Sequence, residues 1–389
     1  MRKEVKLTAK GERWVRTGHP WVYQDDLQAP AADLAGEVVR VRAPGGQLLG
    51  QAFCNPRSKI TLRWLTRDPD QAVDRSFWAE RLKEALLLRR RVVQETTAHR
   101  VIYSEADGFP GLIVDRYGDV VVLQSLSLGI DRILEDLVAL LKEFLKPAAI
   151  VARNDAGVRT LEGLPQEKKV ISGTLPARIE IQEGACRMLV DVMEGQKTGA
   201  YLDQRENRIW ARAFARGRVL DAFAYQGGFG LQAARQAEEV LAIEDSAAAV
   251  ERLKQNAALN GYGNVRVEKG NAFERLRELE KAGEKFDLVV LDPPAFAKNR
   301  SEVRDAQRGY REINLRALKL LRPGGTLVSC SCSYLVGEEL FLELLRRAAA
   351  DSQRTVRFVE GRTQARDHPI LMTHPESRYL KCVAVETAC

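Results

Sequence analysis

Two short segments of the chain carry side chains that could do covalent chemistry on a planar ring. Residues 292–296 read Asp-Pro-Pro-Ala-Phe and directly follow an apolar stretch at 286–291. Cys330 and Cys332 follow a second apolar stretch at 326–329. Because ligands bind outside the carboxyl ends of strands in an open α/β sheet, we expect both segments at one edge of one sheet. A stiff loop with an aromatic ring and a nearby thiol together predict an enzyme that works on a nucleobase.

The loop at 292–296 is predicted to hold the base. Proline fixes φ and has no N–H, so Pro293 and Pro294 make the loop stiff and leave its carbonyl oxygens exposed. We expect these two prolines and Phe296 to contact the substrate, with the Phe296 ring stacked on the base. Asp292, at the strand end, is expected to serve both catalysis and cofactor binding. The alternative is a Pro-Pro turn that only ends a strand.

A cysteine beside such a loop predicts nucleophilic catalysis on cytosine. Carbon 5 of cytosine is too weak a nucleophile to take a methyl group directly, but a thiolate that adds to carbon 6 turns the ring into a reactive enamine. Loss of the carbon 5 proton then expels the cysteine. Cys332 is nearer the loop and is the predicted nucleophile, although Cys330 would face the same way on a continuing strand. The alternative is that the cysteine is a small buried hydrophobic residue.

Polar side chains at successive strand ends predict the cofactor. A strand that starts at 218 and ends near 221 leads into a Gly-rich loop and a helix, but an acid stands where a dinucleotide-binding turn would begin its glycines. Such an acid suits a cationic or amine-bearing ligand. An acid at the end of the next strand can accept hydrogen bonds from both ribose hydroxyls. An amide after the third strand can bind the edge of an adenine. The predicted pocket residues are Asp221, Phe223, Gly227, Gly228, Glu244, Asp245 and Asn271. They fit S-adenosylmethionine, and the alternative is a nicotinamide-binding domain.

Alternating strands and helices are predicted to position these residues. From Cys186 onward, strands end near residues 221, 244, 268, 291 and 329, and helices begin near residues 228, 246, 272, 304 and 337. Ser246 is a good N-cap and Gly261 a good helix stop. Five such units predict an α/β fold with a mainly parallel, doubly wound, Rossmann-like sheet. Two last strands, at 356–360 and 379–386, have no helix between them and predict a reversed strand at the sheet edge.

Two smaller domains are predicted to precede this sheet. Residues 1–70 show short β segments with a hairpin, which indicate a small β-barrel or sandwich. Residues 75–185 combine short strands with helices, one of them at 130–146, which indicates an α+β domain. The third predicted domain spans residues 186–389.

The composition predicts a basic globular protein. The 389-residue chain is 45% hydrophobic and 29% charged, as in a soluble protein, and no apolar run is long enough for a membrane span. The net charge of +7 and pI of about 9.1 fit a polyanionic partner such as nucleic acid, and fit a soluble basic enzyme equally well. Six scattered cysteines indicate neither a disulfide framework nor a metal site, so a cytoplasmic protein is expected.

Several motifs make the chain resemble a known family over essentially its whole length. Residues 18–23, Gly-His-Pro-Trp-Val-Tyr, resemble the opening of an RNA-binding PUA domain, and residues 105–118 resemble the signature of the family's central domain. Residues 331–333, Ser-Cys-Ser, match the family's nucleophile motif. The family is the RlmI-like group of bacterial three-domain methyltransferases, which form 5-methylcytosine in large-subunit ribosomal RNA.

The resemblance implies further residues and partners. Residues 197–205 resemble the segment that precedes the family's cofactor fold, so Lys197, Tyr201, Gln204 and Arg205 are expected to help wall the S-adenosylmethionine site. The implied partner is 23S ribosomal RNA, free or in a large-subunit assembly intermediate, and a homodimer is left open.

One departure from other RNA cytosine-5 methyltransferases concerns product release. Many carry a second cysteine directly after the prolines, where this chain has Ala295 and Phe296. Another group must then take the carbon 5 proton. His368 and His374 lie late in the chain in His-Pro pairs, and we favour the interpretation that they are ordinary loop histidines.

Two other functions remain alternatives. The first is an RNA methyltransferase that acts on another base atom, with Cys332 used only for packing. The second is a non-catalytic RNA-binding or ribosome-assembly protein that holds S-adenosylmethionine without turnover. The acid series and the cysteine argue against the second.

Overall fold

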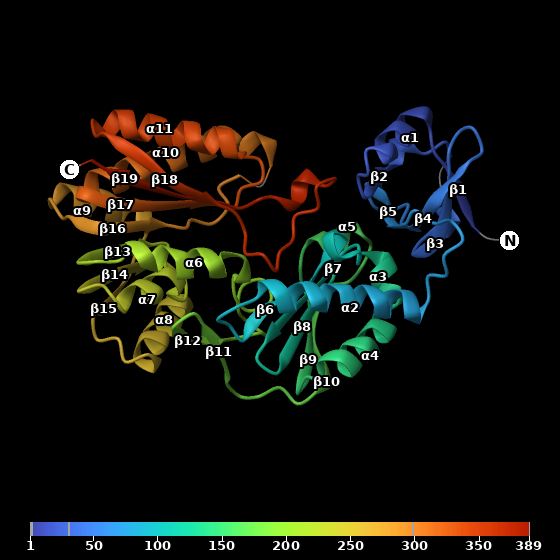
Figure 1. Cartoon of the computed structure of the whole chain (residues 1–389), viewed down its shortest axis with the longest axis horizontal. Coiled ribbons are helices and arrows are strands. Elements are labelled where there is room, and N and C mark those ends of the chain that lie inside the picture. The colour runs from blue at the N-terminus through green and yellow to red at the C-terminus, as the bar shows by residue number, and fades with distance from the viewer. Residues whose placement is uncertain (1–2, 30–31, 298, 389) are drawn as a thin grey trace. The chain divides into compact units, whose positions relative to one another are not determined.

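The computed structural model describes residues 3–29, 32–297 and 299–388, and it divides into two compact units (Figure 1). The first unit comprises Met1–Ile181, Val190–Leu202 and Arg366–Ser377, and the second comprises Gln182–Leu189, Asp203–Ala365 and Arg378–Cys389. Each unit therefore combines segments that are distant in the sequence. The division into three sequence domains stays a prediction.

The first unit opens with a five-stranded sheet in the order β1-β3-β4-β5-β2. Its strands are β1 (Glu4–Lys6), β2 (Trp21–Tyr23), β3 (Glu37–Arg42), β4 (Leu48–Cys54) and β5 (Ile60–Thr66). The hairpin is formed by β3 and β4, which are antiparallel. Helix α1 (Ala9–Arg16) was not predicted, and Thr8 caps it by accepting a hydrogen bond from the Gly11 N–H. Its sequence signal is weak because this short helix buries only Gly11 and Val15.

A second five-stranded sheet of the first unit has the order β10-β9-β8-β7-β6. Its strands are β6 (Ala98–Tyr103), β7 (Leu112–Tyr117), β8 (Val120–Ser125), β9 (Ala149–Asn154) and β10 (Glu167–Gly173), and its helices are α2 (Arg75–Val92), α3 (Leu128–Arg132), α4 (Leu134–Leu145) and α5 (Val158–Leu161). The prediction of a single helix at 130–146 was wrong. Ile133, with φ −107° and ψ 14°, separates α3 from α4.

Buried contacts join these two sheets within the first unit. Phe53 of β4 stacks on Trp78 of α2 with ring centroids 5.9 Å apart, in a core that both sheets share. Arg63 of β5 forms buried ion pairs with Glu105, at 3.0 Å, and with Glu162, at 3.1 Å. The Trp21 indole N–H also donates to Glu105 at 2.7 Å. Strands β2, β4 and β5 therefore pack as an integral part of this unit.

The second unit contains the predicted doubly wound sheet, in the order β15-β14-β13-β16-β17-β19-β18. Its strands are β13 (Arg218–Ala222), β14 (Glu239–Glu244), β15 (Val265–Lys269), β16 (Phe286–Leu291), β17 (Leu321–Ser331), β18 (Val356–Arg362) and β19 (Lys381–Thr387). The first five are parallel, and β19 is antiparallel to both β17 and β18. The predicted parallel sheet is confirmed, and a reversed strand is present, but it is β19, which lies between β17 and the edge strand β18 rather than at the edge itself. A separate two-stranded sheet consists of β11 (Ile179–Glu183) and β12 (Cys186–Val190).

Helices cover both faces of the seven-stranded sheet (Figure 1). They are α6 (Arg205–Ala211), α7 (Gly228–Ala234), α8 (Ala247–Leu259), α9 (Ala272–Lys281), α10 (Val303–Leu320) and α11 (Glu338–Ser352). One core packs α9, α10 and α11 on the sheet, and another packs α6 and α7 on the opposite face. Ser246 caps α8 as predicted, and Gly261 follows its end with φ +70°.

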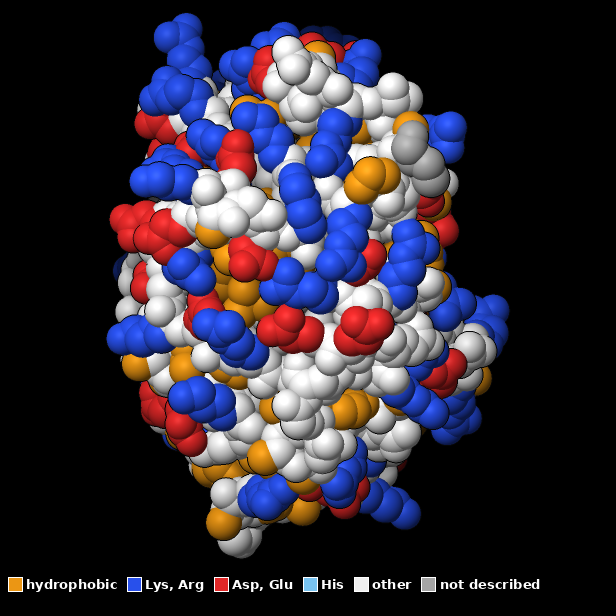
Figure 2. All heavy atoms as spheres, turned by 90° about the vertical axis from the view of Figure 1, so that its left-hand side faces the viewer, with side chains coloured by type: hydrophobic (Ala, Val, Ile, Leu, Met, Phe, Trp, Pro, Cys, Tyr) orange, Lys and Arg blue, Asp and Glu red, His pale blue; other side chains and the backbone are white. Residues whose placement is uncertain are grey.

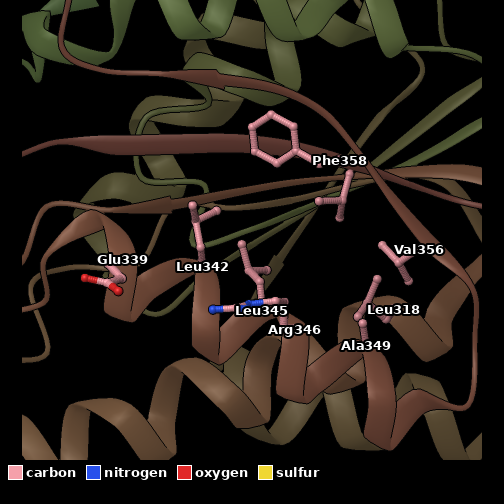
Figure 3. A pocket seen from close by; sticks show the side chains of 9 residues that line it. Leu318, Glu339, Leu342, Leu345, Arg346, Ala349, Val356 and Phe358 are labelled. Carbon is pink, nitrogen blue, oxygen red and sulfur yellow. The ribbon is translucent and has the colours of Figure 1, made fainter.

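The outer surface of the second unit has an apolar groove at its sheet edge. The groove lies between α11 and the edge strand β18, where Phe358 is 59% exposed (Figure 3). Figure 2 shows one face of the molecule, on which Lys and Arg side chains lie among Asp and Glu side chains rather than in an unbroken basic patch. No helix among the described residues is both long and apolar enough to cross a membrane.

Candidate active site

Carboxylates from three neighbouring strands meet at the carboxyl edge of the seven-stranded sheet. Asp221 lies in β13, Glu244 ends β14 and Asp292 directly follows β16. These strands are parallel neighbours, so their carboxyl ends lie side by side. Burial raises the pKa of Asp221 to about 7, and the charges of Asp292 and Glu244 add to this rise. The edge is therefore a place where a cation would be stabilised.

Asp221 is a buried acceptor with spare capacity. Its side chain is 1% exposed, and its Oδ2 accepts a hydrogen bond from the Gly230 N–H at 2.7 Å. The other oxygen, Oδ1, is buried and has no hydrogen-bond partner among the described residues. Such an atom usually marks an absent ligand or water. The ammonium group of an amino acid would fit it.

The loop after β13 is held in an unusual backbone conformation. Phe223 and Tyr225 have φ values of 88° and 47°, in the left-handed region that side chains other than glycine rarely adopt. The N–H groups of Phe223 and Ala224 both donate to the Ile243 carbonyl, which ties the loop to β14. Strained backbone of this kind concentrates at ligand sites. The sequence predicted Phe223 as a pocket residue but gave no sign of this strain.

Glycines let the loop and the next helix pass close to their neighbours. Gly227 has φ +91°, and a Cβ there would lie 2.9 Å from Leu253. A Cβ on Gly228 would lie 2.5 Å from the Arg208 side chain. Gly230, absent from the predicted pocket residues, supplies the N–H that holds Asp221. Its role depends on a contact across nine positions, which spacing alone does not reveal.

Glu244 is oriented by two backbone donors. Its Oε2 accepts from the Tyr225 N–H and its Oε1 accepts from the Ser246 N–H, both at 2.8 Å. Each carboxylate oxygen keeps a lone pair, so both can still accept from ribose hydroxyls. The predicted neighbour Asp245 is exposed.

Asn271 has a structural role that the sequence analysis did not include. It is the N-cap of α9, where its Oδ1 accepts from the N–H groups of Phe273 and Glu274 at 3.0 and 3.4 Å. The carbonyl end of the amide is thereby fixed. The NH₂ end is left to donate, which agrees with the expected contact to an adenine.

Of the four residues predicted in segment 197–205, two lie in the second unit with the carboxylates. Gln204 donates to Asp292 Oδ1 at 2.7 Å and is itself held by the Asn207 amide. Arg205 is fully buried at the start of α6. Lys197 and Tyr201 belong to the first unit, where the Lys197 ammonium lies 4.6 Å from the Tyr201 ring centroid. The cofactor contacts of these two residues stay predictions.

Ser333 joins the proline loop to the cysteine segment. Its Oγ accepts from the Phe296 N–H at 3.1 Å and lies 3.1 Å from the Tyr310 hydroxyl. Ser331 and Ser333 are both fully buried, whereas Cys332 between them is half-buried. Cys332 therefore differs from the two serines in being partly accessible. The sequence analysis missed this contact of Ser333 because a serine in a sequence does not reveal which distant backbone N–H its hydroxyl will bind.

The two cysteines have different surroundings. Cys330 lies within β17, directly opposite Cys382, and is fully buried in the core beneath α6 and α7. Burial, followed by its contacts with Cys382, raises the pKa of the Cys330 thiol well above its usual value. Cys332 follows the last residue of the strand. Only Cys332 therefore combines partial exposure with a position at the carboxyl edge.

The proline loop itself is only partly available to a substrate. Pro293 is buried and Pro294 is exposed. Phe296 is half-buried, with its ring centroid 4.7 Å from Tyr310 and 5.7 Å from Phe273. Much of its ring therefore packs inside the protein. Base stacking on Phe296 stays a prediction.

The late histidines lie in the first unit. His368 is buried, with Nδ1 3.0 Å from Asp367. His374, His19 and Glu376 bring potential metal-ligand atoms within 4.8 Å of one another. The Trp21 N–H donates to His19 Nδ1, so in the neutral ring Nε2 carries the proton and faces Glu376 at 3.3 Å. We therefore interpret this group as a hydrogen-bonded cluster.

Comparison with known proteins identifies the family. Residues 165–372 match the family described as S-adenosylmethionine-dependent methyltransferase, and residues 5–67 match a PUA-like domain. A protein named ribosomal RNA large subunit methyltransferase I from Shewanella denitrificans is 40% identical over 386 residues, which are 97% of each chain. The protein of that name from Yersinia pseudotuberculosis is 38% identical over 96% of this chain and 97% of its own.

Solved structures show the same fold. A methyltransferase complexed with SAH has a TM-score of 0.85 at 18% identity, covering 99% of this chain and all of the other. A SAM-dependent methyltransferase from Streptococcus mutans has a TM-score of 0.83 at 18% identity, with the same coverage. The fold is a Rossmann-like class I methyltransferase sheet with an N-terminal PUA β domain and a small central α+β domain.

The cofactor is S-adenosylmethionine, and the site fits it. The unpartnered Asp221 oxygen suits the ammonium group, the oriented Glu244 carboxylate suits the ribose, and three acids suit a ligand that carries a sulfonium charge. The chain therefore belongs to the S-adenosylmethionine-dependent methyltransferase family that includes the proteins named ribosomal RNA large subunit methyltransferase I.

Proposed function

We propose that this protein methylates carbon 5 of a cytosine in 23S ribosomal RNA through a covalent bond between Cys332 and the base. The observation that carries the proposal is the placement of the two cysteines. Cys332 is half-buried and stands next to Ser333, which holds the proline loop, whereas Cys330 is packed in the core. The names of the 38–40% identical relatives support ribosomal RNA as the substrate.

The proposed reaction balances without a redox step. Bound S-adenosylmethionine supplies an electrophilic methyl group. The Cys332 thiolate adds to carbon 6, and the π electron pair of the carbon 5–carbon 6 double bond moves to carbon 5. Carbon 5 then forms the new bond to the methyl group, while the methyl–sulfur bond of the cofactor breaks and S-adenosylhomocysteine leaves. A base then removes the carbon 5 proton. The double bond re-forms as the carbon–sulfur bond breaks, and Cys332 leaves as a thiolate.

The chain's own residues would orient these partners. Asp221 and Glu244 would hold the amino acid and ribose of the cofactor at two neighbouring strand ends. Gln204 fixes Asp292, which lies between the cofactor acids and the proline loop. Ser333 keeps that loop beside Cys332. Positioning of this kind lowers the barrier by holding the reacting atoms in line.

The proposal also assigns roles to the three sequence domains. Residues 1–70 would bind the RNA, residues 75–185 would connect, and residues 186–389 would catalyse. A cytoplasmic location and an RNA substrate that is free or within an assembling large subunit belong to the same proposal. The homodimer stays a prediction.

Analysis of the methylated nucleoside tests the proposal. Ribosomal RNA lacking the modification is incubated with the protein and a cofactor carrying an isotopically labelled methyl group, and the digested nucleosides are separated. We expect the label in 5-methylcytidine with the native protein and none with Cys332→Ala. Label in a methylated purine or on an exocyclic amine would contradict the proposal and favour a methyltransferase that acts on another atom.

A further inference from the structure

A buried lysine lies next to the proposed nucleophile. Lys381 begins β19, where it pairs with Ser331 of β17, one residue before Cys332. Its side chain is folded inward, and the residue is only 7% exposed. The ammonium nitrogen donates to the Ser333 carbonyl at 2.7 Å and to the Tyr379 carbonyl at 2.9 Å. Lys381 therefore holds the backbone directly after Cys332.

This lysine has no carboxylate partner within ion-pair distance in the described part of the chain. Its electrostatic neighbours are Cys332, Glu338 and Arg378. Glu338 and Arg378 form an exposed ion pair with each other, so the Glu338 charge is already compensated. Burying a cation without a counter-ion is costly. The remaining neighbour that can become an anion is Cys332.

The titration of the lysine agrees with this arrangement. Burial lowers the pKa of Lys381 to about 8, and its interaction with Cys332 opposes that change. A lysine with such a pKa can accept a proton near neutral pH. Tyr310, which also faces Cys332, cannot play that part, because burial raises its pKa to about 12.

We propose that Lys381 is a positioning residue that takes the proton of the Cys332 thiol and holds the resulting thiolate ready for attack. The inference rests on the proposed function above, in which that thiolate is the nucleophile. The S–H bond breaks, an N–H bond forms on Lys381, and the ion pair replaces two neutral groups with no electron lost or gained. Two of the three ammonium donors engage carbonyls, which leaves the third for the thiolate.

The pH dependence of Cys332 alkylation tests this inference directly. The full-length protein, without RNA, is treated with iodoacetamide across a pH series, and the Cys332 peptide is quantified by mass spectrometry. The thiolate is the reactive form, so the rate reports its fraction. We expect the native midpoint to lie clearly below the ordinary thiol value of about 8.5. Lys381→Met should lower the rate at pH 7 about tenfold, which is a midpoint shift of about one unit.

Two further variants separate charge from packing. Lys381→Arg keeps the positive charge and should retain most of the rate at pH 7. Lys285→Met is a control for the loss of a lysine that donates to a backbone carbonyl, because the exposed Lys285 donates to that of Lys319 at 2.6 Å. Lys285 directly precedes β16, so it lies at the amino ends of the parallel strands, opposite the carboxyl edge. Its removal should leave the alkylation profile unchanged.

Clear outcomes would overturn the inference. Identical profiles for the native protein and Lys381→Met would show that the lysine only clamps the backbone. If Lys381→Met does not fold, the native profile decides alone, and a midpoint at or above about 8.5 refutes the ion pair. Alkylation needs no RNA, so it tests the Lys381–Cys332 pair independently of the substrate. Methylation of a different base atom would refute the proposed function but would not change a low alkylation midpoint for Cys332.

Discussion

At the scale of single residues, the site is defined by charges that the free protein leaves uncompensated. Asp221 keeps one buried oxygen without a hydrogen-bond partner among the described residues, and burial, with the charges of two further acids added, raises its pKa to about 7. A cationic ligand reverses that effect because it favours the ionised carboxyl group. The binding of S-adenosylmethionine and the ionisation of Asp221 should therefore be linked.

This linkage predicts that cofactor affinity rises with pH. Below its raised pKa, Asp221 is protonated and must lose a proton before it can pair with the ammonium group. Between pH 6 and pH 7 the ionised fraction grows about fivefold while an α-ammonium group stays mostly charged, so the affinity should grow by roughly the same factor. Calorimetry at a series of pH values measures it. Asp221→Asn should bind more weakly and show a flat profile, and a native affinity that does not change with pH would contradict this role.

At the scale of secondary structure elements, one residue often serves a helix and the site together. Asn271 caps α9 through its carbonyl oxygen and is left with an amide donor at the cofactor edge. Ser246 caps α8 and its N–H holds Glu244. The helix starts therefore fix where the ligand-binding groups point.

Two substitutions of Asn271 should separate its two roles. Asn271→Ala removes the cap, which costs about 1 kcal/mol of stability, and also removes the amide donor. Asn271→Asp keeps a capping oxygen at a helix N-terminus and removes only the donor. Thermal unfolding should therefore be lowered only in the alanine variant, whereas calorimetry should show weaker cofactor binding in both. A native affinity in Asn271→Asp would remove the adenine contact from this account.

The alternating strands and helices of the seven-stranded sheet were predicted well from the sequence, whereas several elements of the first unit were missed. The predicted helix starts agree closely with α7 to α11, because caps, glycines and apolar runs mark them locally. Strand β10 and helix α1 were missed because they bury few residues, and strand β6 was missed although four of its six residues are buried. The acids of the site were predicted from their positions at strand ends. The contacts of Gly230, Ser333 and Lys381 join distant segments, and no local pattern reveals them.

At the scale of the whole molecule, residues 3–66 are not a loosely attached module. Arg63 lies between Glu105 and Glu162 within the first unit, and Phe53 packs in the core of the second sheet. Removal of the N-terminal residues would leave two buried carboxylates without their cation. A truncated chain would therefore lose stability as well as RNA contacts, and substitutions in the full chain are the better probe of RNA binding.

The buried pairs of Arg63 should contribute strongly to the stability of the first unit. Arg63→Ala leaves Glu105 and Glu162 without their ion-pair partner, and breaking a buried pair in this way costs about 3–5 kcal/mol. Denaturant unfolding followed by fluorescence measures the loss. Arg75→Ala is the control, because the Arg75–Glu143 pair is exposed and should contribute at most about 1 kcal/mol. Equal effects of the two substitutions would show that the Arg63 network is not a stabilising core.

The covalent trapping of RNA tests the central claim most directly. An RNA substrate with fluorine at carbon 5 of cytosine cannot lose a proton there, so a cysteine that has added to carbon 6 cannot be expelled after methyl transfer. With S-adenosylmethionine present, the native protein should form an adduct that survives a denaturing gel, and peptide mass spectrometry should place the RNA on Cys332. Cys332→Ala should form none, and Cys330→Ala should still form it. An adduct on Cys330, or methylation of cytosine carbon 5 by Cys332→Ala, would contradict the account.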